Sequence, residues 1–448
     1  MNYKLAIYNF ISKLPLSFQI ALMRMNRFPQ LIFGREYYRN YKRLKDGGLS
    51  QNEVQEKVVS MFNFAVEHVP FYRERYGKID SIEAFTSHVK FIDKDDVILN
   101  LEKFYSPLKD SESYDLQTTG GTSGKPLMIY QPKDRFKHEL AMVHYAWSTV
   151  GYNFSVRGVL RNHKLSDGQK CRIDPVTREL QFDNFDNSNE NFWFVYQTLK
   201  KYQIQFIHAY PSAAYQFALF CKREKLDLTF IKAFLCSSEN VLPEYRMLIE
   251  VELGIKLFGF YGHTEKLVFA YNCPKSDAYH VEHGYGYFEL INESGEIVVQ
   301  RGEMGEICGT TLSNEGMPLI RYKTGDYAVL EGTSCPHCGA RKMTLKSIVG
   351  RWNGDFIENL DGTKVSLTAL NLHSDDYTYL DGLQYYHPYA GYVEVWIVPS
   401  SGFNDKLEES LLNQIATKFK KDMVVVVKKV PSLKKKDNGK FVQLIKGF

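Results

Sequence analysis

The stretch TTGGTSGKPL, residues 118–127, places three glycines, four hydroxyl side chains and one lysine within ten residues. Glycine has no Cβ, so backbone N–H groups in such a stretch can converge on an anion, and hydroxyl groups and a lysine add further donors. This composition is typical of a loop that holds phosphate. Taken alone, the stretch is explained as well by a flexible surface turn.

The stretch differs from the common phosphate-binding loop, in which four residues separate two glycines and a Ser or Thr directly follows the lysine. Here Gly120 and Gly124 lie one residue closer together, and Pro126 follows Lys125. Proline has no N–H to donate and restricts the residue before it. We therefore expect a phosphate-binding loop of another class.

Further short motifs follow in order along the chain: YGHTE (261–265), RYKTGDYAVL (321–330), VGRWNGDF (349–356) and DNGKF (437–441). Each one alone is equally typical of a polar turn. The informative feature is the order in which these motifs follow the glycine-rich loop along the chain.

In this order the motifs resemble those of the adenylate-forming (AMP-binding) acyl-ligase superfamily. The closest resemblance is to its phenylacetate-CoA ligase-like branch, which includes capsular polysaccharide biosynthesis ligases. The segment HVPFYRERYG, residues 68–77, is similar to the start of that branch. The resemblance covers most of the chain. It implies an ATP-dependent acid ligase that forms an acyl-adenylate, releases pyrophosphate and then transfers the acyl group.

The resemblance also implies roles for the matching residues. Tyr261, followed by Gly262, would stack on adenine, Thr264 would contact the α-phosphate, and Glu265 would bind Mg²⁺, a hard cation that prefers oxygen ligands. Asp326 would accept hydrogen bonds from the ribose hydroxyls. The residues that would wrap the β- and γ-phosphates are Thr118, Thr119, Gly120, Gly121, Thr122, Ser123, Gly124 and Lys125.

Three more positions complete the nucleotide site that the resemblance implies. Arg351 would reach the ribose or a phosphate, and the segment Ser237-Ser238-Glu239 would border the adenine pocket. Lys440 would neutralise charge during adenylation. Such a reaction needs positioning and charge stabilisation rather than a protein nucleophile, and no Gly-x-Ser-x-Gly motif is found.

The chain departs from the branch near its proposed hinge. Asn353 occupies the expected hinge position, and Asp355 comes one residue late, so either residue can be the hinge. Around Lys440 the usual order of residues is also loose, and the neighbouring lysines 434–436 are rival cations, which we interpret as a solvated loop.

The motif CPHCGA supplies Cys335 and Cys338 at the spacing of a zinc-binding turn. The segment NCPKSDAYHVEH supplies Cys273 and either His280 or His283, and His337 is a competing ligand. Four protein ligands would make the zinc site structural. The alternative is a reduced cysteine pair without metal.

The remaining sequence predicts the elements that position these residues. A helix over 54–69 ends before Pro70. From about residue 190, helices and strands alternate, which predicts an α/β fold with doubly wound mixed sheets. The expected elements are helices at 191–202, 212–225 and 243–253, strands at 204–210, 231–238 and 255–262, and a hairpin at 287–300 with its turn at 292–295.

Two domains are expected. Residues 1–350 would form the adenylation domain, with a β-rich subdomain. Residues 351–448 would form a small, mobile α+β lid with a strand at 393–399, a helix at 406–421 and a strand at 423–430.

Composition excludes several protein classes. The chain has 448 residues, 24% of them charged, and a formal net charge of +4, which does not predict a nucleic-acid partner. No apolar run predicts a transmembrane helix. The N-terminus is expected to pack on the protein, with a peripheral membrane contact as the alternative. Seven cysteines, odd in number, indicate a reducing compartment, and we expect a cytoplasmic protein without disulfides.

The expected cofactors are ATP and Mg²⁺, with CoA and structural Zn²⁺ as further candidates. The expected partners are a small carboxylic acid and a thiol or amine acceptor. Arg161, His163, Lys164 and His208, next to aromatic residues, favour a hydroxylated or anionic acid. The resemblance to capsular polysaccharide biosynthesis ligases implies a role in surface polysaccharide biosynthesis. The alternatives are an aryl-acid CoA ligase of the phenylacetate type and a non-catalytic nucleotide-binding descendant.

Overall fold

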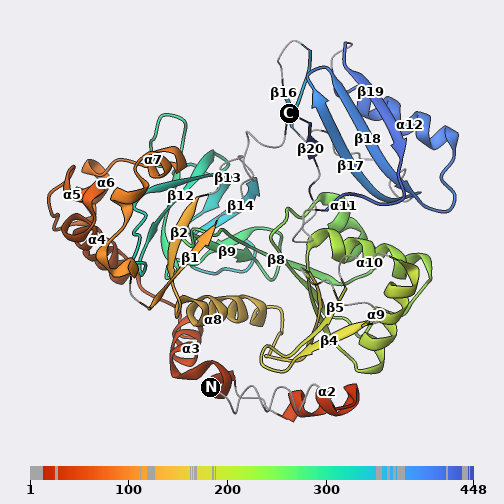
Figure 1. Cartoon of the computed structure of the whole chain (residues 1–448), viewed down its shortest axis with the longest axis horizontal. Coiled ribbons are helices and arrows are strands. Elements are labelled where there is room, and N and C mark those ends of the chain that lie inside the picture. The colour runs from red at the N-terminus through yellow and green to blue at the C-terminus, as the bar shows by residue number, and fades with distance from the viewer. Residues whose placement is uncertain are drawn as a thin grey trace. The chain divides into compact units, whose positions relative to one another are not determined.

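The computed structural model of the chain (Figure 1) consists of two compact units, one formed by residues 1–156 and 258–350 and the other by residues 157–257 and 351–448. No helix among the described residues has the length and apolar character needed to cross a membrane. The described residues are 14–25, 29–110, 112–118, 127–161, 163, 165, 169–183, 186, 188–349, 356–360, 364–366, 370, 379–419, 422–435, 442 and 444–447.

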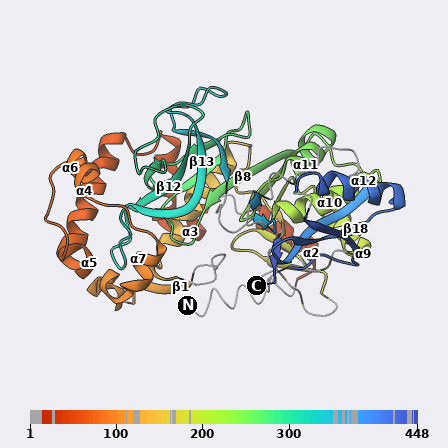
Figure 2. The ribbon, with the colours of Figure 1, turned by 90° about the horizontal axis from the view of Figure 1, so that it is seen from above.

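Helices dominate the N-terminal part of the first unit. The predicted helix at 54–69 is confirmed as α4 (Gln51–His68), which begins three residues earlier because Ser50 and Glu53 form a capping box. Its buried face packs on the strands β11 (Gly286–Ile291) and β12 (Met304–Thr311), and α4 and β12 are both labelled in Figure 2. The other helices are α2 (Leu16–Met25), α3 (Pro29–Lys45), α5 (Pro70–Arg73), α6 (Ile82–His88), α7 (Lys94–Leu99) and α8 (Arg135–Ser148), with short 3-10 turns at Leu101–Phe104 and Pro107–Asp110.

The sheet of the first unit is antiparallel, with its described strands in the order β11-β12-β13-β14-β10-β9-β8. A separate hairpin pairs β1 (Tyr114–Thr118) with β2 (Met128–Pro132). The bounds are β8 (Lys256–Gly262), β9 (Phe269–Asn272), β10 (Tyr279–Val281), β11 (Gly286–Ile291), β12 (Met304–Thr311), β13 (Tyr322–Gly332) and β14 (Thr344–Val349).

The predicted hairpin at 287–300 is wrong in its second arm. The turn forms, since the Gly295 amide donates to the Asn292 carbonyl. The second arm forms no strand, although Ile297 bridges to Ile291 and the Val298 amide donates to the Leu290 carbonyl. The strand β11 pairs instead with β12. In the second arm Val298 is buried but Ile297 and Val299 are exposed, whereas Ile307 and Cys308 of β12 are both fully buried, so β12 contributes more apolar burial.

The first part of the second unit is the predicted alternation of helices and strands. Strands β7, β6, β3 and β5 are neighbours in that order and run parallel, and β4 pairs antiparallel with β5. The predicted helix at 243–253 is α-helical only over α11 (Pro243–Arg246) and continues as a π-helix at Met247–Glu252. The other bounds are β3 (Arg157–Leu160), β4 (Cys171–Asp174), β5 (Glu179–Phe182), α9 (Asn189–Lys201), β6 (Phe206–Ala209), α10 (Pro211–Arg223) and β7 (Ala233–Ser237).

The second part of this unit holds the predicted C-terminal elements. A sheet in the order β19-β18-β17-β20 is covered by the helix α12, which contacts β19. Its core includes Val393, Val395, Leu411 and Ile415. The bounds are β15 (Phe356–Glu358), β16 (Lys364–Ser366), β17 (Leu380–Tyr389), β18 (Tyr392–Pro399), α12 (Asp405–Ala416), β19 (Val424–Lys429) and β20 (Leu444–Lys446).

Candidate functional site

Two residues expected to hold the nucleotide meet in the first unit. Tyr261 lies at the end of β8 and Asp326 lies in β13, and the Tyr261 hydroxyl donates a hydrogen bond of 2.8 Å to Oδ2 of Asp326. Strands β9, β10 and β14 separate β8 from β13 in the sheet order. The sheet must therefore curve strongly for these two side chains to touch.

The backbone around Asp326 is fixed by a local network. The Asp326 amide donates to Oγ1 of Thr324 (3.1 Å), which itself donates to the Ile307 carbonyl (2.8 Å). Gly325 has φ 72°, a conformation that favours glycine, and its amide donates to Glu306. The β12–β13 register also shifts between Glu306 and Cys308. Such irregularities re-aim side chains next to functional sites, here the Asp326 carboxylate.

Tyr261 is held as a neutral hydrogen-bond donor. Desolvation and the neighbouring Asp326 carboxylate raise the pKa of the Tyr261 hydroxyl well above its ordinary value. The residue as a whole remains partly exposed, and Gly262 beside it is exposed. The ring can therefore offer a face to a planar ligand while its hydroxyl orients Asp326.

Thr264 and Glu265 lie in the turn that follows β8. Gln131 of β2 donates to the carbonyls of Thr264 (3.4 Å) and Glu265 (3.2 Å) and so ties this turn to the β1–β2 hairpin. The Glu265 side chain is only 4% exposed. Its Oε2 lies 3.0 Å from Nδ1 of His263, and its Oε1 accepts a hydrogen bond of 3.4 Å from Tyr322. The carboxylate is thus fixed in place before any cation binds.

In the second unit, the expected segment Ser237-Ser238-Glu239 lies at the end of β7. Ser238 has φ 71°, a left-handed conformation that is uncommon for a residue other than glycine. Oε2 of Glu239 accepts a hydrogen bond of 3.0 Å from the Ser212 amide at the start of α10. A carboxylate is stabilised at a helix N-terminus. Sequence reasoning did not find this capping contact, because it joins residues 27 positions apart.

Several predicted residues lie outside the described part of the chain. These are the loop residues 119–125, the hinge candidates Asn353 and Asp355, and both Arg351 and Lys440. Thr118 ends β1, where its backbone is paired with Met128.

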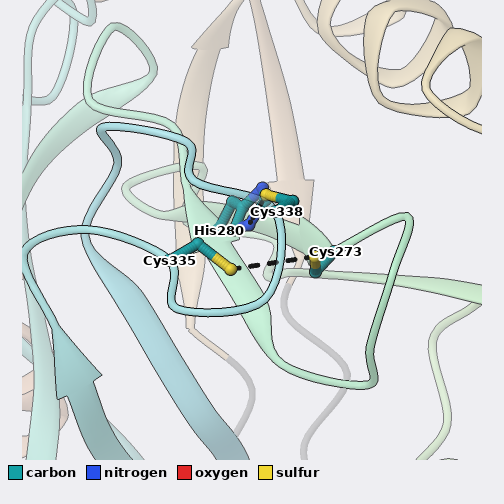
Figure 3. A group of neighbouring side chains, drawn as sticks. All are labelled: Cys273, His280, Cys335 and Cys338. Atoms are coloured by element: carbon teal, nitrogen blue, oxygen red, sulfur yellow. Dashed lines mark hydrogen bonds between the residues drawn. The ribbon is translucent and has the colours of Figure 1, made fainter.

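Cys273, His280, Cys335 and Cys338 come together in the first unit (Figure 3). Cys273 follows β9, His280 lies in β10, and the two other cysteines lie in the turn between β13 and β14. Their ligand atoms all lie within 4.8 Å of one another. Of the histidines considered from the sequence, the cluster includes His280 and neither His283 nor His337.

The spacing within the cluster matches a tetrahedral zinc site. Ideal Zn–S and Zn–N bonds place two sulfur ligands about 3.8 Å apart, and a sulfur and a nitrogen about 3.6 Å apart. The sulfurs of Cys273 and Cys335 are 3.8 Å apart, and Sγ of Cys338 lies 3.5 Å from Nε2 of His280. A disulfide would need about 2 Å between sulfurs, and all seven cysteines are free.

In the cluster, His280 and Cys273 are shifted towards the protonation states that bind metal, whereas burial raises the pKa of Cys338 to about 11. Burial, followed by the charges of Lys342 and His337, lowers the pKa of His280 to about 4, so the imidazole is neutral at neutral pH. Burial opposes ionisation of Cys273, but hydrogen bonds from the Lys275 amide and Ser276 outweigh it and lower the pKa of the thiol. A neutral imidazole and a thiolate are the forms that bind metal.

Comparison with known structures identifies the fold. The chain matches 2-hydroxyisobutyryl-CoA ligase, solved in a postadenylation state with R3-HIB-AMP, with a TM-score of 0.66 and 17% identity over 88% of each chain. The mixed α/β fold expected from the sequence is thereby confirmed as the fold of an adenylate-forming acyl ligase.

Two curated relatives are similar to the chain over most of its length. The chain is 22% identical to the protein CapK of Staphylococcus aureus over 397 residues, which cover 83% of this chain and 82% of CapK. It is 25% identical to the phenylacetate-coenzyme A ligase of Pseudomonas putida over 309 residues, or 63% of this chain and 67% of that protein. No model of a protein family matches the chain.

The predicted resemblance to the phenylacetate-CoA ligase-like branch is confirmed, since CapK and a phenylacetate-coenzyme A ligase are both similar to the chain. The acid-ligase class predicted from the sequence is the class named for the phenylacetate-coenzyme A ligase and for the structural neighbour. Their names also support the general reaction, in which an acid is activated and its acyl group is then transferred, without specifying the acid or the acceptor.

Proposed function

We propose that this protein uses ATP and Mg²⁺ to convert a carboxylic acid into an acyl-adenylate and then transfers the acyl group to a thiol or an amine. The observation that carries the proposal is the Tyr261–Asp326 hydrogen bond, which brings together two residues matched to the nucleotide site from strands far apart in the sheet.

In the first step an oxygen of the acid attacks the α-phosphorus of ATP. The new P–O bond forms as the bond to pyrophosphate breaks, and the leaving electron pair goes to pyrophosphate. Both reactants are anions, so the enzyme must place positive charge and hydrogen-bond donors around them. Mg²⁺ held by Glu265 would supply part of that charge. Lys440, the glycine-rich loop and Thr264 would supply the rest.

The other residues of the proposed site position the nucleotide. The Tyr261 ring would stack on adenine, and the Asp326 carboxylate, which already accepts one hydrogen bond from Tyr261, would accept those of the ribose hydroxyls. Glu239 and Ser238 would border the adenine, and Arg351 would contact the ribose or a phosphate. Holding both reactants in one geometry is itself a large part of the rate enhancement.

The second step depends on the acceptor, which we propose to be a thiol of CoA or of a carrier protein, or an amine. Similarity to CapK over 83% of the chain supports a role in surface polysaccharide biosynthesis. The free cysteines support a cytoplasmic location, where thiols stay reduced.

ATP–pyrophosphate exchange tests the proposal. The exchange rate is measured with sugar acids, amino acids and aryl acids for the unaltered protein, for Lys440→Ala, and for Lys446→Ala in the exposed end of β20 as a control. We expect exchange with one class of acid, a loss of at least about 100-fold in Lys440→Ala and little change in the control. Exchange with aryl acids alone would favour the phenylacetate type of ligase. ATP binding without exchange for any acid would favour a non-catalytic descendant.

We further propose that Cys273, His280, Cys335 and Cys338 hold a structural Zn²⁺ ion. The two ligand separations of 3.8 and 3.5 Å support this assignment. Four protein ligands leave no open coordination position, so the ion would stabilise the fold and take no part in the reaction.

A further inference from the structure

Arg161 lies at the carboxyl ends of three neighbouring parallel strands of the second unit. It directly follows β3, while Tyr210 follows β6 and Ser237 ends β7. The strands β3, β6 and β7 are consecutive in the sheet and parallel. In open parallel sheets, ligands bind outside the carboxyl ends of the strands.

The guanidinium of Arg161 is held only by neutral groups within the described part of the chain. Nη1 donates to Nε2 of His208 (2.7 Å) and to Oγ of Ser237 (2.6 Å), and Nη2 donates to Oγ of Ser238 (3.4 Å). The guanidinium carbon also lies 5.1 Å from the centre of the Tyr210 ring. These contacts orient the side chain, and no carboxylate of the described residues forms an ion pair with its guanidinium.

Two neighbouring groups bear on the charge at this position, and the Arg161 and Glu239 charges both act on Tyr210. Nε2 of His208 must carry no proton, because it accepts the hydrogen bond from Arg161, so the imidazole is neutral. Glu239, next to Ser238, directs one carboxylate oxygen to the Ser212 amide at the start of α10. By contrast, Arg157, four residues before Arg161, is a buried structural arginine whose guanidinium is ion-paired with Glu179 at 2.5 Å.

We infer that Arg161 recognises a second anionic group on the acid substrate, apart from the carboxylate that reacts. Arginine suits this task, because its planar fork of five N–H donors matches carboxylate geometry and it stays charged. The enzyme would then prefer acids with two anionic groups, such as dicarboxylic acids. This inference rests on the proposed function, since it describes the acid pocket of that reaction.

Paired acids test the inference. ATP–pyrophosphate exchange is measured with terephthalate against benzoate, 4-carboxyphenylacetate against phenylacetate, and glutarate against valerate. We expect the unaltered protein to favour the dianionic member, and Arg161→Leu to lower that preference about 10- to 100-fold through KM for the acid. Arg161→Lys should restore part of it. Arg73→Gln, at an exposed arginine of α5 in the first unit, is the matched control and should keep the preference.

The same assay separates a substrate role from the alternatives. A rise in KM for ATP with an unchanged acid preference would mean that Arg161 binds a nucleotide phosphate, and would overturn the inference. A uniform loss of exchange for both members of each pair, with a lower melting temperature, would assign Arg161 a purely structural role and also overturn it.

Direct binding distinguishes failure of the inference from failure of the proposed function. If no acid supports exchange, terephthalate and glutarate are titrated calorimetrically into the unaltered protein and Arg161→Leu without ATP. Binding that is weakened about 10-fold or more by the substitution supports the inference even when adenylation fails. Equal binding to both proteins, or none to either, overturns it.

Discussion

The Tyr261 hydroxyl and the Asp326 carboxylate are joined by a 2.8 Å hydrogen bond across 65 residues of sequence. Asp326 therefore has an oriented oxygen before nucleotide binds, and less ordering is needed on binding. In an interaction with an ionised group, such a hydrogen bond contributes about 1.5–3 kcal/mol.

Replacing Asp326 tests its assignment to the ribose. Asp326→Asn keeps the size of the side chain but removes the charge that strengthens ribose contacts. We expect ATP affinity, measured by calorimetry, to fall about 10- to 100-fold, and Tyr261→Phe to produce a smaller loss. Asp80→Asn, an exposed position, is the control. Unchanged ATP affinity in Asp326→Asn would contradict the assignment.

Glu265 should control the dependence on Mg²⁺. Glu265→Gln keeps the size of the side chain next to His263 and Tyr322. It replaces a negatively charged ligand of the cation with a neutral one. We expect pyrophosphate exchange to fall at least about 100-fold and the Mg²⁺ concentration for half-maximal rate to rise. Glu293→Gln, in the exposed turn after β11, serves for comparison. An unchanged Mg²⁺ titration would remove Glu265 from the metal site.

The cysteine cluster predicts a metal content of about one zinc ion per chain by elemental analysis. Cys338→Ser should lose the metal and lower the melting temperature by more than about 5 °C, because a structural ion contributes directly to folding. Cys171→Ser, a partly buried cysteine outside the cluster, should keep the metal. A Cys338→Ser protein with the stability of the unaltered chain would refute the structural role.

Acidification should destabilise the first unit through His138 of α8. Burial, followed by Arg135, Arg43 and Lys57, lowers its pKa to about 4, while Asp134 acts in the opposite direction. The folded state therefore holds His138 neutral, and its contribution is fully present above the unfolded pKa of about 6.5 and lost as pH falls towards 4.

The size of this effect is about 3 kcal/mol at pH 4, and denaturant unfolding between pH 7 and pH 4 measures it. The free energy of unfolding of His138→Gln should fall less over this range than that of the unaltered protein. His88→Gln, at an exposed histidine of α6, should follow the unaltered protein. If the free energy of unfolding depended equally on pH in all three proteins, His138 would be excluded as the cause.

Local patterns were sufficient to predict most individual elements. The helix α4 follows from its apolar spacing and from Pro70, and the alternation from α9 to β8 follows from short apolar strands between amphipathic helices. The second arm of the 287–300 hairpin was wrong, because strand choice depended on the burial of β12, which lies farther along the chain.

Side-chain contacts between distant segments could not be predicted in the same way. Tyr261 and Asp326 were both identified by motif, but their contact requires a curved sheet that neither motif encodes. The partners of Arg161 lie on two other strands, up to 77 residues away. The cysteines of the candidate metal site were predicted from the sequence because Cys335 and Cys338 have the spacing of a zinc-binding turn. The sequence could not show whether His280 or His283 joins the cysteines, because this depends on how β10 pairs with its neighbouring strands.

The cysteine and histidine cluster joins segments 62 and 58 residues apart. With an ion bound, it closes a chain loop that the unfolded protein would otherwise leave open. Closing about sixty residues into a loop costs the folding chain entropy equivalent to about 4 kcal/mol, and the free energy of ion binding to the folded state would offset that cost. A single ion would thus stabilise the fold under conditions in which thiols stay reduced and disulfides do not form. The lifetime of the folded enzyme would then depend on the availability of that ion.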